Sequence, residues 1–125
     1  MTNHVSYENR PLVYIAGPYT HPDPVQNTHE VIRVAAELVD KGLVTPFVPH
    51  LTLLWHLVDP RPLDFWYEYD VAMLARCDAL LRLPGDSTGA DREVAFAKER
   101  GLPVFTKQDE LAEWAENRLD SQCVG

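Results

Sequence analysis

Leu12-Val13-Tyr14-Ile15-Ala16 is a short apolar run that stops at Gly17-Pro18. The run is rich in β-branched and aromatic residues, and a Gly-Pro pair is a strong turn signal. This combination is typical of a buried strand that leads into a loop. We therefore predict a strand over residues 12–16 and interpret the remainder of the chain outward from it.

Helices and strands alternate after this strand. Apolar residues at helical spacing predict helices over residues 25–41, 63–76, 89–100 and 109–119. Short apolar runs bounded by Pro or Gly predict strands over residues 43–48, 78–83 and 102–106. The apolar stripe of the first helix consists of Val25, Val31, Ile32, Ala35, Leu38 and Val39. Residues 51–58 are apolar nearly throughout; we interpret them as a core segment or a subunit contact, without assigning a secondary structure.

The alternation implies βαβ units and hence a parallel sheet with helices on both faces. We predict one α/β domain over residues 1–125, a flavodoxin-like (Rossmann-like) three-layer sandwich with four to five strands. Ligands of such folds bind outside the carboxyl ends of the strands. Residues 17–20, 49–50 and 84–89 leave those ends, and they contain the unusual residues of the chain.

Composition excludes several classes of function. The chain has 125 residues, of which 46% are hydrophobic, and a net charge of −8 without a cluster of Lys or Arg. A nucleic-acid polymer is therefore not an expected partner, although a helix N-terminus can bind a single phosphate. We find no membrane-length apolar run and no secretory signal, so we expect a cytoplasmic protein.

Cofactor and metal signatures are missing from the sequence. Cys77 and Cys123 have no metal-ligand spacing, and the GxGxxG, GxxxxGK[ST] and GxSxG patterns are absent. We expect no metal and no cofactor.

Residues 84–93 form the strongest local candidate for a site. Ser87 or Thr88 can cap the helix, and Gly89 and Ala90 leave its first amides uncovered. Glu93 then falls in the first turn or just beyond it, where the helix dipole favours the carboxylate and makes it a candidate nucleophile. The plainer interpretation is a capped helix with an acidic first turn.

Three further side chains are candidates, each with a plainer alternative. Asp70, in an aromatic-rich helix, is a candidate general acid or sugar-hydroxyl acceptor, or else a solvated acid. Tyr14 could orient a catalytic carboxylate or simply pack in its strand. His50 follows a strand and could contact a base or a phosphate, or be incidental. For Asp78 we expect a local structural role.

Several motifs together resemble the nucleoside 2-deoxyribosyltransferase superfamily, which includes the 2'-deoxynucleoside 5'-phosphate N-hydrolases. The likeness covers about residues 12–106 and rests on Tyr14-Ile15-Ala16-Gly17-Pro18-Tyr19, Tyr67-Glu68-Tyr69-Asp70, Cys77-Asp78-Ala79-Leu80 and Ser87-Thr88-Gly89-Ala90-Asp91-Arg92-Glu93. It implies that Glu93 attacks the anomeric carbon to form a glycosyl-enzyme, which water or a second base then resolves.

The resemblance also implies roles for the neighbouring residues. Tyr14 matches the tyrosine that holds the glutamate, and Asp70 matches the acid that assists departure of the base. The pocket floor of the family matches the loop formed by Gly17, Pro18 and Tyr19.

Ser87 departs from the pattern of transferases that act on free nucleosides, which commonly have an acid there to accept the sugar 5'-hydroxyl. A serine hydroxyl can donate to a 5'-phosphate, whereas a carboxylate would repel it. Ser87, Thr88, Gly89 and Ala90 therefore favour a nucleotide substrate, although Asp86 and Asp91 count against this. The C-terminal carboxylate of the family, which reaches a neighbouring subunit, has no evident match in residues 120–125.

We predict cleavage of the N-glycosidic bond of a (2'-deoxy)nucleoside 5'-monophosphate, with release of a free base. The alternatives are base exchange between deoxynucleosides, a non-catalytic nucleotide-binding module, and a purely structural domain. We expect a homodimer or larger assembly, with residues 51–58 and the aromatics of residues 65–69 as candidate contacts.

Overall fold

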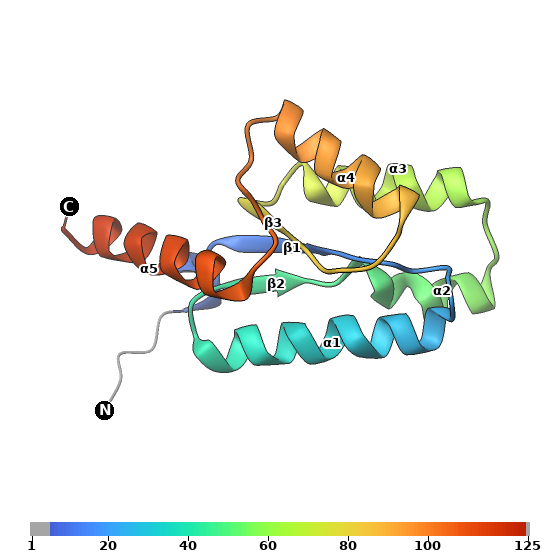
Figure 1. The fold of residues 1–125 in the computed structure, drawn as a ribbon, viewed down its shortest axis with the longest axis horizontal. Helices are drawn as coiled ribbons and strands as arrows, with labels where there is room; N and C mark the ends of the chain where they lie inside the picture. The colour runs from blue at the N-terminus through green and yellow to red at the C-terminus, as the bar shows by residue number, and fades with distance from the viewer. Residues whose placement is uncertain (1–5, 125) are drawn as a thin grey trace.

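Four parallel strands form the single sheet of the computed structural model, which describes residues 6–124 and the side chains of residues 6–119. The spatial order is β2–β1–β3–β4 (Figure 1). The strands are β1 (Leu12–Ala16), β2 (Thr45–Phe47), β3 (Ala79–Arg82) and β4 (Val104–Phe105). The predicted strand number and parallel direction are confirmed, and β2, β3 and β4 are each shorter than predicted.

Helices follow the strands as predicted. The four long ones are α1 (Pro24–Lys41), α3 (Leu63–Leu74), α4 (Thr88–Glu99) and α5 (Gln108–Val124). The unassigned segment is a 3-10 turn, η2 (Pro49–Thr52), followed by the short helix α2 (Leu53–Val58), and a further 3-10 turn, η1 (Tyr7–Asn9), precedes β1. None of the helices in the described residues is long and apolar enough to cross a membrane.

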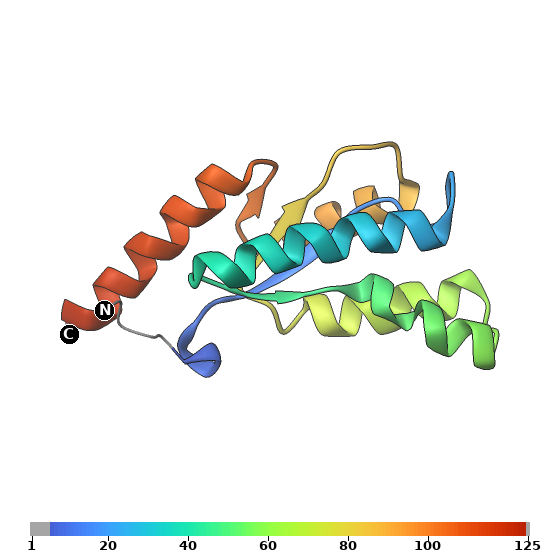
Figure 2. The ribbon, with the colours of Figure 1, turned by 90° about the horizontal axis from the view of Figure 1, so that it is seen from below.

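The side chains of β1 alternate between two cores, one on each face of the sheet. Val13 and Ile15 pack with buried residues of α1 and α5. Tyr14 and Ala16 pack with buried residues of α3 and α4. Figures 1 and 2 show α1 on one side of the sheet and α3 with α4 on the other. The predicted three-layer α/β sandwich is therefore confirmed.

The buried stripe of α1 is narrower than predicted. Val31, Ala35 and Leu38, at helical spacing, are buried against the sheet. Val25 is 63% exposed and Ile32 is 44% exposed, so both were wrongly assigned to the buried stripe. Sequence periodicity gives a hydrophobic face, but the width of that face which the sheet can cover depends on the packing of the helix.

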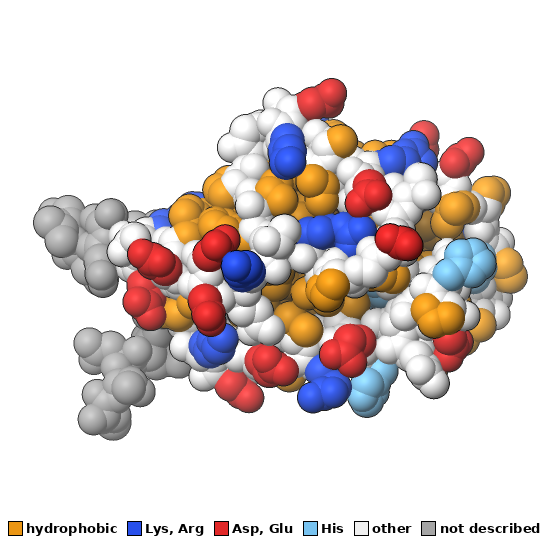
Figure 3. Space-filling view, in the orientation of Figure 1, with side chains coloured by type: hydrophobic (Ala, Val, Ile, Leu, Met, Phe, Trp, Pro, Cys, Tyr) orange, Lys and Arg blue, Asp and Glu red, His pale blue; other side chains and the backbone are white. Residues whose placement is uncertain are grey.

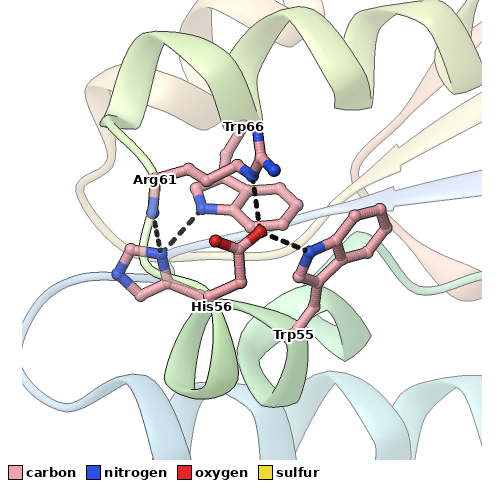
Figure 4. Close-up of polar contacts among 5 residues, drawn as sticks. Trp55, His56, Arg61 and Trp66 are labelled. Atoms are coloured by element: carbon pink, nitrogen blue, oxygen red, sulfur yellow. Dashed lines mark hydrogen bonds and ion pairs between the residues drawn. The ribbon is translucent and has the colours of Figure 1, made fainter.

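The segment from α2 to α3 is fastened by side-chain hydrogen bonds (Figure 4). His56 Nδ1 accepts from Trp66 Nε1 at 2.8 Å and from the Arg61 amide at 3.2 Å. Asp59 accepts from Trp55 Nε1 at 3.3 Å and from Arg61 Nε at 2.8 Å. These bonds fix Trp66 of α3, and the loop between the two helices, relative to α2.

Apolar side chains on the outside of this segment remain uncovered, and those more than 60% exposed are Leu51, Leu54, Leu57, Val58 and Leu63. We call these five residues the α2 patch. In Figure 3, hydrophobic side chains gather at the end of the molecule where α2 lies in Figure 1. Residues 51–58 are therefore not a core segment of this chain.

Candidate functional site

A cavity of about 350 Å³ lies at the carboxyl ends of β1, β2 and β3. The loops after these strands form part of its wall, and α3 and the first turns of α4 form the rest. Its lining residues are Gly17, Pro18, Tyr19, Thr20, His21, Pro49, His50, Thr52, Leu63, Trp66, Tyr67, Asp70, Asp86, Ser87, Thr88, Gly89, Ala90, Arg92 and Glu93. The chain leaves β1 toward β2 on one side and returns to β3 on the other, so the cavity lies at the topological switch point.

A hydrogen bond between Tyr14 and Glu93 lies at the base of this cavity. The Tyr14 hydroxyl donates to Glu93 Oε2 at 2.5 Å, although the two residues are 79 positions apart. Tyr14 is fully buried and Glu93 is 8% exposed. The structure therefore brings together the two side chains that the sequence motifs predicted as partners, and it fixes one oxygen of the carboxylate.

Ser87 caps α4, and this resolves the alternative between Ser87 and Thr88. The Ser87 hydroxyl accepts from the Ala90 amide at 3.1 Å, and its carbonyl accepts from the Asp91 amide. Helix geometry gives the amides of Thr88 and Gly89 no acceptor within the helix. The cavity wall therefore presents amide donors and the positive end of the helix dipole.

The protonation of Glu93 differs from the prediction. The sequence suggested that the helix dipole keeps Glu93 ionised, but burial raises its pKa to about 7. The hydrogen bond from Tyr14 and the charge of Arg82 both act to lower this pKa, and burial outweighs them. The degree of burial was not visible in the sequence, and it makes Glu93 a group that titrates near neutral pH.

Asp70 faces the same cavity and retains its proton more strongly. Burial first, and then the charge of Glu93, raise the pKa of Asp70 to about 8. Its Oδ1 is buried and has no hydrogen-bond partner among the described residues. The two carboxyl groups titrate as a pair. Glu93 loses its proton first, because Tyr14 and Arg82 stabilise its carboxylate, and Asp70 then holds the remaining proton.

His50 supports the loop after β1. Its Nε2 donates to the Pro18 carbonyl at 2.8 Å, and the residue is 4% exposed. Burial lowers the pKa of His50, so the ring is neutral with its proton on Nε2. Nδ1 is then an acceptor, and it has no partner among the described residues. The Tyr19 ring meets the His50 ring edge to face at 5.5 Å between centroids. The predicted residues Gly17, Pro18, Tyr19 and His50 thus share one wall of the cavity.

The loops after β1 and β3 touch each other through Gly85. This residue has a φ of +115°, which side chains rarely adopt, and a Cβ there would lie 2.7 Å from Pro18 Cγ. Only a glycine allows the two loops to meet this closely. The close contact joins two walls of the cavity.

Two arginines of the site were missed by the sequence interpretation. Arg82, at the end of β3, donates to the carbonyls of Leu83 and Gly85 and pairs with Asp91 at 3.0 Å. Asp91 thereby has a cationic partner, which weakens its repulsion of an anionic ligand. Arg92 lines the cavity, and its guanidinium carbon lies 3.7 Å from the centroid of the Tyr67 ring. Arg92 adjoins Glu93 in the quoted motif, but only the packing of α3 on α4 shows its partner.

Asp78 has a structural role, as predicted, but the role is not local. Its carboxylate accepts from the Leu12 amide at 2.8 Å and from Arg118 at 3.3 Å. These bonds tie β1 and α5 to the residue that precedes β3, at the amino end of the strands. The expectation of a local contact was wrong because the partners come from distant parts of the chain.

Residues 11–109 match the family model described as a domain of unknown function (DUF1937). The chain belongs to the DUF1937 family. A comparison with curated proteins gave no match. The α/β fold of this DUF1937 chain is similar to solved structures of two enzymes.

One similar structure is the 2-deoxyribosyltransferase of the psychrotolerant bacterium Bacillus psychrosaccharolyticus, with a TM-score of 0.53 and 20% identity over 74% of this chain and 69% of that one. Another is the 2-deoxyribosyltransferase of Leishmania mexicana, with a TM-score of 0.54 and 24% identity over 75% of this chain and 61% of that one. This DUF1937 chain therefore has the fold that the sequence motifs implied, and it spans about two thirds of the length of each of these proteins.

The structure brings all the predicted site residues of the DUF1937 chain to one place. Tyr14 lies below the cavity, and the other predicted residues line it. Their catalytic and binding roles remain predictions. Residues 120–125, where no C-terminal carboxylate match was found, lie outside the side chains that the structure describes.

Proposed function

We propose that this protein hydrolyses the N-glycosidic bond of a (2'-deoxy)nucleoside 5'-monophosphate, with Glu93 as the nucleophile. The observation that carries the proposal is the 2.5 Å hydrogen bond from Tyr14 to Glu93, in a cavity that Asp70 also lines. The fold shared with two 2-deoxyribosyltransferases supports the same chemistry. A cytoplasmic location is part of the proposal.

In the first step, ionised Glu93 attacks the anomeric carbon of the sugar. Because Glu93 Oε2 accepts the hydrogen bond from Tyr14, Glu93 Oε1 is the attacking oxygen. The bond from the anomeric carbon to the base breaks as the glycosyl ester forms. Asp70, which holds its proton at neutral pH, gives it to the departing base.

In the second step, a water molecule resolves the ester. Asp70 is now a carboxylate and accepts a proton from the water as the oxygen of that water attacks the anomeric carbon. The ester bond to Glu93 breaks, its carboxylate returns, and Asp70 regains its proton. One water is consumed, and the products are a free base and the sugar 5-phosphate.

The preference for a 5'-phosphate rests on the N-terminus of α4. The Ser87 oxygen accepts from the Ala90 amide, so its hydroxyl proton is available to a phosphate oxygen. The amides of Thr88 and Gly89 are further donors at the positive end of the helix dipole. The small side chains of Gly89 and Ala90 leave room for a phosphate to approach the helix.

Base exchange between deoxynucleosides is the second candidate, because both similar structures are 2-deoxyribosyltransferases. Incubation of the protein with a nucleotide, with and without a second free base, separates the two reactions. Free sugar phosphate in both samples supports hydrolysis, whereas a new nucleoside or nucleotide only in the presence of the second base supports transfer.

A panel of ribo- and deoxyribonucleosides with and without a 5'-phosphate, scored by release of the base, tests the proposal itself. We expect release from at least one deoxynucleoside 5'-monophosphate. A protein that binds members of the panel but releases no base from any of them would refute the enzyme and favour a nucleotide-binding module.

Homo-oligomer formation is also part of the proposal, and the α2 patch supports it. Leu57 and Leu54 are 67% and 71% exposed. Exposed apolar surface of this kind marks interaction sites. We expect Leu57→Asp to lower the mass measured by analytical ultracentrifugation. Val25→Asp, at a 63% exposed position outside the patch, is the matched control. A wild-type monomer would contradict the expectation.

A further inference from the structure

Arg92 is the one lysine or arginine among the cavity-lining residues of the described chain. Three acids, Asp70, Asp86 and Glu93, line the same cavity. Even with the proton of Asp70 in place, the remaining carboxylates would repel a phosphate dianion. A substrate that carries such an anion therefore needs a compensating cation, and Arg92 is the residue in position to supply it.

The charge of Arg92 is not used by a carboxylate of the protein. None of the ion pairs between described residues includes Arg92. The neighbouring acid, Asp91, pairs instead with Arg82, which also binds the carbonyl of Gly85. Asp91 and Arg92 are adjacent on α4, and adjacent side chains of a helix do not face each other. The guanidinium of Arg92 thus keeps its hydrogen-bonding edge for another partner.

Tyr67 holds the Arg92 side chain in place. The guanidinium carbon lies 3.7 Å from the centroid of the Tyr67 ring, within the distance of a cation–π contact. Such stacking engages the face of the guanidinium and leaves the N–H donors at its edge, which match two oxygens of a phosphate. Arg92 comes from α4 and Tyr67 from α3, and both line the cavity, so the pair joins the two helices at the cavity wall.

We propose, on the basis of the function proposed above, that Arg92 selects the 5'-phosphate of the substrate by a charge-assisted contact, with Tyr67 as its positioning residue. In this proposal Ser87 and the first amides of α4, which line the same cavity, bind the same phosphate. The site then discriminates a nucleoside 5'-monophosphate from the corresponding nucleoside. Arg92 takes no part in the bond-breaking steps.

Binding measurements test this proposal separately from turnover. We would titrate the four common 2'-deoxynucleosides and their 5'-monophosphates into the wild type, Arg92→Gln and Arg92→Lys by calorimetry, each in a Glu93→Gln background so that no substrate is consumed. We expect the wild type to bind at least one monophosphate tighter than its nucleoside by on the order of 10- to 100-fold, as a charge-assisted contact provides. Arg92→Gln should lower this ratio several-fold, to the share that Ser87 and the α4 amides provide, and Arg92→Lys should leave an intermediate ratio.

Arg100→Gln is the matched control, because Arg100 directly follows the same helix and stacks on Phe96, but does not line the cavity. It should leave the ratio at its wild-type value. Tyr67→Leu should lower the ratio, whereas Tyr67→Phe, which keeps an aromatic face, should not.

A ratio near 1 in the wild type, or one that Arg92→Gln leaves unchanged, would overturn the role of Arg92. Arg92→Lys keeps the charge and loses only the planar fork. An intermediate ratio in this variant would therefore show that the effect of Arg92→Gln is not a folding defect. If the phosphate preference depends on Arg92 but no base is ever released, Arg92 stands as the anion-binding residue and the hydrolase proposal fails.

Discussion

The two faces of the sheet are built on the same strands but filled with different chemistry. On the face covered by α1 and α5, β1 contributes Val13 and Ile15, and the buried cluster is entirely apolar. On the face covered by α3 and α4, β1 contributes Tyr14, whose hydroxyl meets the buried Glu93. The first face supplies stability, whereas the second holds two carboxyl groups where their charged forms are disfavoured.

This difference shows that the face covered by α3 and α4 carries an unfavourable free-energy contribution, which the apolar face does not. Burial raises the pKa of both Glu93 and Asp70, which means that deprotonating them in the folded protein costs free energy. In the proposed mechanism, the same burial provides one proton donor, Asp70, and one nucleophile, Glu93, at neutral pH. We expect substitutions on the two faces to separate activity from stability.

The largest effect on activity should come from Glu93→Gln. An amide cannot attack the anomeric carbon, so base release should fall by on the order of 10⁴-fold. The unfolding midpoint in denaturant should not fall, because the substitution removes a buried titratable group. Glu99→Gln, at the exposed end of the same helix, should leave the rate unchanged. A Glu93→Gln enzyme with wild-type turnover would exclude Glu93 as the nucleophile.

The opposite behaviour is expected on the apolar face. Leu38 is buried against the sheet, and Leu38→Ala should lower the free energy of unfolding by about 2–5 kcal/mol. The rate per folded molecule should change by less than about two-fold, because Leu38 is remote from the cavity lining. Denaturant unfolding and base release on the same samples check both. A rate that fell far beyond the folded fraction would show that the two faces are coupled.

Tyr14→Phe should produce a smaller effect on activity together with a shift in its pH dependence. Removing one donor to the nucleophile should lower the rate by on the order of 10²-fold. The hydrogen bond from Tyr14 lowers the pKa of Glu93, so its loss should raise that pKa above about 7. Since the ionised carboxylate attacks, the acidic limb of the pH–rate profile should move to higher pH. An unshifted limb would argue against this coupling.

The smallest expected effect is on the pH dependence of stability. The pKa of Asp70 is about 8 in the folded protein and near 3.9 in an unfolded chain. Between these values the folded state binds more protons at Asp70, so the contribution of Asp70 to the stability of the wild type should fall as the pH rises from about 4 to 8.

Asp70→Asn removes this proton linkage. Its stability relative to the wild type should therefore increase by at least about 1 kcal/mol between pH 5 and pH 8. Denaturant unfolding at both pH values measures this difference. If the free energies of unfolding of the two proteins changed equally between pH 5 and pH 8, the folded protein would not disfavour the charged form of Asp70.

The sequence predicted elements and partners better than it predicted environments. The run before Gly17 marked β1, and Ser87 marked the start of α4, because both are local signals of strand and helix ends. The pairing of Tyr14 with Glu93 was implied by the resemblance to the nucleoside 2-deoxyribosyltransferase superfamily. The burial that raises the pKa of Glu93 could not be predicted, because it depends on packing between α3, α4 and the sheet.

The same limit explains the other differences. Val25 and Ile32 fit the apolar period of α1, but the sheet covers only part of the face of that helix. Asp78 binds Leu12 and Arg118, which are distant in sequence. The contact between Arg92 and Tyr67 joins two helices whose packing no local pattern determines.

The contact between Gly85 and Pro18 has a consequence for redesigning the pocket. A protein engineer who wishes to change the accepted base would naturally replace the loop after β1 or the loop after β3 alone. Because a Cβ at position 85 would lie 2.7 Å from Pro18 Cγ, a new loop after β3 that lacks this glycine would collide with Pro18. A library of pocket variants should therefore keep Gly85 wherever it keeps Pro18, and should vary the two positions jointly elsewhere.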